Sequence, residues 1–106
     1  MQREPPLLYP VCFHCQQASE KYIKAFLTYR QVEFPKTHNI SELLELAATV
    51  DDKLAEELMP AVILTPYGVE ARYPADLPEP SQAEGAEALA LARQVAQTVT
   101  SRIKQD

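Results

Sequence analysis

Polar side chains that could bind an anionic ligand gather near the start of the chain. In a helix that begins near Val11, a rotation of about 100° per residue brings six of them into one arc: His14, Gln17, Glu20, Lys21, Lys24 and Thr28. Ammonium groups bind phosphate, and histidine and glutamine can reach the edges of a base or a ribose. The stripe predicts a ligand site made by His14, Gln17, Lys21 and Lys24. The alternative is an ordinary solvated face with an ion pair between Glu20 and Lys24.

A second group of such residues falls in the stretch 65–80, where Tyr67, Glu70, Arg72 and Tyr73 follow one another closely. An aromatic ring can stack on a base, and an arginine can hold a phosphate through two hydrogen bonds. Arg72 and Tyr73 are therefore predicted to bind the ligand together with the first stripe. In the structural alternative, Arg72 pairs with a helix carboxylate and the tyrosines close the open end of the bundle.

Catalysis of RNA cleavage would draw on His38. As a general base it would take the proton of a ribose 2′-hydroxyl while an arginine, Arg30 or Arg72, stabilises the charge that develops on the phosphate. The alternative is that His38, which precedes a helix start, hydrogen-bonds exposed backbone amides there and fixes the loop.

The pair Cys12 and Cys15 has the spacing of half a zinc site or of a redox pair. Zinc would need His14 or His38 and one further ligand, and a redox pair of this kind normally follows a strand. We expect both thiols to pack in the apolar side of the helix, and we expect neither a metal nor a cofactor.

These residues need helices to position them. Prolines make residues 1–10 a leader or docking arm, and the first helix is expected over 11–31. Its apolar side is predicted to hold Val11, Cys15, Ala18, Tyr22, Ala25, Phe26 and Tyr29. Asn39 and Glu42 form a capping box for a second helix that ends near Val50.

The second half of the chain predicts two further helices. Asp51 and Asp52 cap a third helix, which Pro60 is expected to kink or break. Five prolines and glycines make 65–80 a loop. Another capping box, Ser81 with Glu84, opens the last helix, and no segment alternates like a strand. The fold class is all-α: an up-and-down antiparallel bundle of about four helices.

Length and charge limit the classes of function. A chain of 106 residues is expected to form one domain over 1–106. Residues 1–40 carry five basic and three acidic side chains, whereas residues 41–106 carry five basic and twelve acidic ones. This balance argues against general coating of nucleic acid. Without a membrane span or a signal peptide, the protein is expected in the cytoplasm with reduced thiols.

Three stretches in order, residues 13–25, 34–39 and 67–74, resemble the HEPN family, the higher-eukaryote and prokaryote nucleotide-binding domains. The resemblance covers about residues 11–104. It implies a bundle of four to five helices, a homodimer, a nucleotide or RNA ligand, and a partner that is a minimal nucleotidyltransferase, as in toxin–antitoxin pairs.

The chain departs from this family pattern in two respects. Family members usually begin with an additional long helix, so a second subunit is expected to cover the exposed face, or the natural start lies upstream. Ribonuclease members carry an arginine followed after four to six residues by a histidine, whereas seven residues separate Arg30 from His38 and no histidine follows Arg72. We therefore favour a binding module without enzymatic activity. The alternatives are a metal-independent endoribonuclease and a ligand-free helical dimerisation scaffold.

Overall fold

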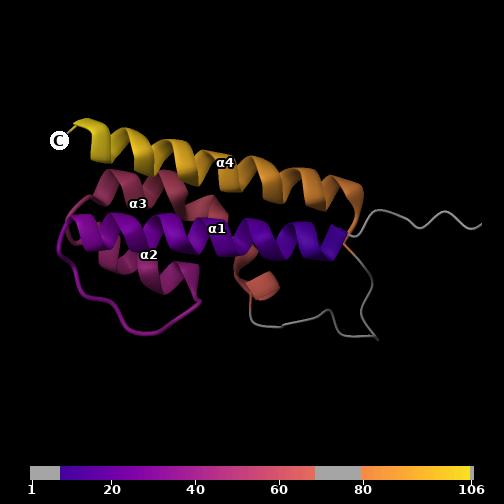
Figure 1. Cartoon of the computed structure of the whole chain (residues 1–106), viewed down its shortest axis with the longest axis horizontal. Coiled ribbons are helices and arrows are strands. Elements are labelled where there is room, and N and C mark those ends of the chain that lie inside the picture. Colours follow the sequence, from indigo (N-terminus) through magenta and orange to yellow (C-terminus); the bar gives the residue numbers. More distant parts are fainter. Residues whose placement is uncertain (1–7, 69–79, 106) are drawn as a thin grey trace, which may run out of the picture.

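The computed structural model describes residues 8–68 and 80–105, and this part of the chain forms four α-helices and one 3-10 helix (Figure 1). In chain order they are α1 (Leu8–Tyr29), α2 (Ile40–Ala48), α3 (Asp52–Leu58), the 3-10 helix η1 (Met59–Gly68) and α4 (Gln82–Gln105). The predicted all-α bundle is confirmed.

The first helix starts earlier than its prolines suggest. It begins at Leu8 and includes Pro10, whereas the sequence predicted a start near Val11. A proline in the first turn of a helix costs no hydrogen bond, because the first amides have no partner within the helix. The predicted leader is therefore wrong for its last three residues, and residues 1–7 lie outside the described part.

The predicted starts of α2, α3 and α4 and the predicted break near Pro60 are confirmed. The side chains of Asn39 and Asp51 each accept a hydrogen bond from the backbone amide three residues later, at 3.1 and 3.0 Å. Ser81 and Glu84 exchange two such bonds, at 3.1 and 2.8 Å. Helix α3 ends two residues before Pro60, and the chain continues as η1.

The two long helices lie side by side and run in the same direction (Figure 1). Gly85 lies against Leu8 at one end, and the Tyr29 hydroxyl lies 3.5 Å from the carbonyl oxygen of Ile103 at the other. Strict up-and-down alternation would have made α1 and α4 antiparallel, so this detail of the prediction is corrected.

The connection between α1 and α2 explains the parallel arrangement. The backbone amide of Val32 donates to Leu27, and His38 contacts Glu20, which lies about two turns further back along α1. The chain therefore returns beside α1 without forming a helix. As a result, α2 runs in the same direction as α1 (Figure 1).

The buried side of α1 agrees only in part with the side that its apolar residues predicted, because Cys15 and Phe26 are buried but the larger residues beside them are not. Val11, Tyr22 and Tyr29 are 41%, 39% and 40% exposed. The buried residues of α1 are Tyr9, Cys12, Cys15, Gln16, Ser19, Glu20, Ile23, Phe26 and Leu27. This side packs against the other helices through a core that includes Ile40, Leu43, Leu44, Leu54, Leu58, Leu64, Val95 and Val99. The polar members of this side can be buried because their hydrogen bonds are made inside the protein.

No helix within residues 8–68 and 80–105 combines the length and the apolar character that crossing a membrane would require. Over the same residues, no three His, Cys, Asp or Glu side chains come together as ligands for a metal ion.

Candidate ligand-binding face and the polar cluster behind it

A buried carboxylate organises the polar residues of α1. Glu20 is only 4% exposed, and its two oxygens have three partners. Gln16 Nε2 donates to Oε1 at 2.9 Å, Lys24 Nζ donates to Oε2 at 2.7 Å, and the Nδ1 atom of His38 lies 2.9 Å from Oε2. The predicted ion pair between Glu20 and Lys24 is confirmed, but its carboxylate faces the protein interior and not the solvent.

The fully buried amide of Gln16 extends this cluster to two other segments. Its Nε2 also donates to the backbone carbonyl of His38 at 3.2 Å, and its Oε1 accepts a bond from Gln17 Nε2 at 3.1 Å. Gly68 at the end of η1 packs so closely on the amide that a Cβ atom there would overlap it. Gln16 therefore holds the α1–α2 connection against α1 through a hydrogen bond, and η1 packs on the same amide.

The environment of Glu20 fixes its charge. Burial alone would raise the pKa of this carboxyl, but the hydrogen bonds from Lys24, Gln16 and His38 and the charge of Lys24 outweigh burial and leave the pKa lowered. Folding therefore favours the ionised form. The resulting stability is fully present above the pKa of an unfolded glutamate, about 4.3, and is lost as the pH falls through the lower pKa of the folded state.

We expect Glu20→Gln to lower the free energy of unfolding by about 1–3 kcal/mol at pH 7, because buried donors lose a charged acceptor. The loss should shrink as the pH falls below about 4.3, the pKa of an unfolded glutamate, because the unfolded wild-type chain then binds a proton that the folded protein binds only at lower pH. Urea unfolding at several pH values measures both effects, with the exposed Glu45→Gln as the matched control. A loss independent of pH would contradict the assigned ionisation.

The residues predicted to bind the ligand on α1 differ in availability. His14 and Lys21 are exposed, whereas Gln17 is half-buried. Lys24 already pairs with Glu20, and its Nζ lies 5.7 Å from the centre of the Phe34 ring. Lys21 is therefore the lysine of this stripe whose charge is directed at the solvent, and Lys24 is held at the stripe's edge.

Arg72 and Tyr73, the predicted ligand residues of the loop, lie outside the described residues, as does Glu70. Their neighbour Tyr67 is described. It is half-buried, its backbone carbonyl accepts a hydrogen bond from the Tyr9 hydroxyl at 3.2 Å, and the two rings have centres 6.2 Å apart. Tyr67 belongs to η1, so the predicted loop over 65–80 is wrong for residues 65–68, and this end of η1 is attached near the beginning of α1.

The two described candidates for catalysis do not meet. His38 lies beside Glu20, whereas Arg30 follows the end of α1, with its guanidinium 5.8 Å from the centre of the Phe26 ring. Ten residues of helix correspond to about 15 Å. The arrangement does bring a carboxylate to Nδ1 of His38, a pairing that orients an imidazole for proton transfer.

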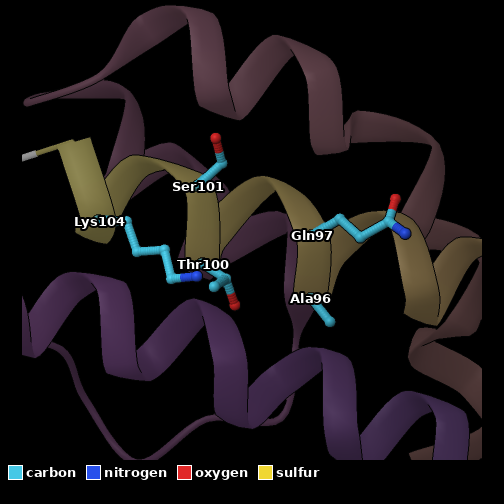
Figure 2. A pocket seen from close by; sticks show the side chains of 5 residues that line it. All are labelled: Ala96, Gln97, Thr100, Ser101 and Lys104. Atoms are coloured by element: carbon cyan, nitrogen blue, oxygen red, sulfur yellow. The ribbon is translucent and has the colours of Figure 1, made fainter.

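An open groove on α4 was not predicted from the sequence, because the residues that line it form no recognisable motif. It has a volume of about 430 Å³ and is lined by Ala96, Gln97, Thr100, Ser101 and Lys104. Figure 2 shows the side chains of Ala96, Thr100 and Lys104 pointing toward the neighbouring α1. Their spacing of four residues along the helix is the signal that could have identified this face.

Cys12 and Cys15 are buried as free thiols in the apolar core. Burial raises the pKa of both thiols, and a hydrogen bond with Tyr67 offsets part of this effect at Cys12. A raised pKa disfavours the thiolate, which is the form that attacks disulfides and binds metals. Both cysteines therefore act as packing side chains of the apolar core.

Residues 7–103 match the model of the HEPN domain family, which is nearly the whole chain. Comparisons with curated proteins and with solved structures gave no significant match.

Proposed function

Because the chain belongs to the HEPN domain family, we propose that it is a cytoplasmic nucleotide- or RNA-binding module that acts with a nucleotidyltransferase partner in a toxin–antitoxin pair. The observation that carries the binding proposal is the outer face of α1, where exposed Lys21 and His14 flank the amide of Gln17. A phosphate would pair with Lys21, and His14 and Gln17 would bond to a base or a ribose. Arg72 and Tyr73 would contribute from the loop.

The module is proposed to act as a homodimer through the apolar part of the same face. The seam consists of Val11, Ala18, Tyr22, Ala25 and Tyr29, which follow one another along α1 in steps of seven, four, three and four residues. Val11, Tyr22 and Tyr29 are each about two-fifths exposed. Such spacing is typical of a helix seam that packs against another helix. A second copy would cover this seam and bring two ligand stripes close together.

We expect Lys21→Ala to weaken the binding of ATP or a short RNA by about five- to tenfold, the usual effect of removing one phosphate contact. Isothermal titration calorimetry at low and moderate salt measures this change. Lys53→Ala, which removes an exposed lysine from α3, is the matched control and should keep the wild-type affinity. Equal affinity of wild type and Lys21→Ala for both ligands would remove Lys21 from the site.

One observation favours a second candidate, a metal-independent endoribonuclease. The Glu20 carboxylate lies against Nδ1 of His38, and the imidazole is 61% exposed, so its other nitrogen could take a proton from a ribose hydroxyl. The absent arginine–histidine spacing and the distance to Arg30 weigh against it. The ligand-free scaffold, the third candidate, would use the apolar seam alone.

For the endoribonuclease, RNA cleavage by extensively purified protein is the measurement, and His38→Ala should lower the rate at least about a hundredfold if His38 is the general base. Glu33→Ala is the control, since Glu33 is exposed on the same connection between α1 and α2 and has no part in the proposed ligand site. Cleavage that persists in His38→Ala, or no cleavage by the wild type, would exclude this candidate.

A further inference from the structure

A second groove lies between α2 and α3, away from the ligand stripe of α1. It has a volume of about 300 Å³ and is lined by Leu44, Glu45, Ala48, Asp52, Ala55, Glu56 and Met59. Its apolar members are Leu44 and Ala48 of α2, Ala55 of α3 and Met59 at the start of η1, and Met59 is 50% exposed. An open groove of this size admits a few apolar side chains from a helix in preference to enclosing a small molecule.

The charge around this groove has one sign. Glu45, Asp52 and Glu56 line it, and none of the described residues that line it is basic. Among the described residues, none of these three carboxylates has an ion-pair partner, whereas the acidic residues Glu20 and Asp51 elsewhere in the chain do. Uncompensated carboxylates around an apolar floor attract a partner of the opposite charge.

We infer that the groove between α2 and α3 docks a basic amphipathic helix of a partner protein. Leucine or alanine side chains of that helix would lie on Ala48, Ala55 and Met59, and lysine or arginine side chains would pair with Glu45 and Glu56. The same surface repels RNA, so the protein partner and the proposed ligand of α1 would occupy different faces.

The probe is a labelled synthetic amphipathic peptide of about five helical turns, with leucine and alanine on one face and lysine on the other. Fluorescence anisotropy with the full chain should show binding that weakens as salt is raised. The same peptide with glutamate in place of lysine should not bind. The double variant Glu45→Lys/Glu56→Lys should weaken binding of the basic peptide at least about tenfold.

Two matched controls separate docking from general attraction by an acidic protein. Glu33→Lys/Glu87→Lys makes the same change of charge at exposed positions that do not line the groove, and should bind as the wild type does. Met59→Ser should weaken binding, whereas Ile63→Ser, which removes a 53% exposed side chain that does not line the groove, should not. Circular dichroism confirms that each variant is folded.

Three results would overturn the inference: equal binding of the acidic peptide, equal weakening by the control double variant, or no effect of Met59→Ser. Sedimentation velocity of the protein alone supplies a fourth. If Glu45→Lys/Glu56→Lys dissociates an oligomer of the wild type, the groove holds a second copy of this chain and not a basic partner helix.

Discussion

Phe26→Ala is expected to lower the free energy of unfolding by about 3–5 kcal/mol, the usual cost of removing a phenylalanine from a packed core. Phe26 is 1% exposed and lies on the buried side of α1, against a core to which all the other helices contribute. The truncation would leave a cavity that rigid helices cannot fill. Urea denaturation followed by circular dichroism measures the loss.

The control for this variant is another aromatic residue of the same helix. The sequence pattern placed Tyr22 on the same side as Phe26, but Tyr22 is 39% exposed. Tyr22→Ala should therefore cost within about 1 kcal/mol. If the outer seam of α1 is the dimer interface, the same variant should shift sedimentation toward the monomer. Equal losses of stability in Phe26→Ala and Tyr22→Ala would contradict the buried side described for α1.

Gly68→Ala has the second largest expected effect, about 3 kcal/mol, which combines overpacking with the loss of buried hydrogen bonds. A Cβ atom at this position would occupy the space of the Gln16 amide. That amide cannot swing aside without releasing its bonds to Glu20 and to the His38 carbonyl. Thermal unfolding of purified wild type and variant measures the difference.

A double-mutant cycle identifies the cause of this loss. Gln16→Ala removes the amide, so adding Gly68→Ala to it should cost clearly less than Gly68→Ala costs alone. Gly85→Ala is the control, because among the described residues its Cβ atom would meet only the flexible end of Leu8, at 3.0 Å, and alanine favours the interior of a helix. Additive losses in the cycle would show that Gln16 is not the residue displaced.

The sequence predicted helix ends better than helix faces. Capping by Asn39, Asp51 and Ser81 and the break before Pro60 depend on neighbours within four residues, so they can be recognised locally. The buried side of α1 includes the amide of Gln16, which makes one of its hydrogen bonds to the backbone carbonyl of the distant His38. No local pattern contains that information, and Tyr22 and Tyr29 suggested a side that is in fact largely exposed.

In the candidate site, too, the features set by neighbouring residues could be predicted, whereas the contacts between distant segments could not. The exposure of His14 and Lys21 and the pairing of Lys24 with Glu20 follow from helical spacing, and the structure contains them. The contact of His38 with Glu20 could not be predicted, because it requires the α1–α2 connection to return along α1. The same return makes α2 and α4 run in the direction of α1 (Figure 1), which a count of helices alone could not establish.

The most direct test of the proposed function is chemical-shift mapping of the ¹⁵N-labelled protein, titrated with ATP and separately with a short single-stranded RNA. The account predicts that at least one of the two ligands shifts the amide signals of Gln17, Lys21 and neighbouring residues on the outer face of α1 in a saturable manner. Saturable shifts confined to other helices, or no shifts with either ligand, would contradict a ligand site on this face.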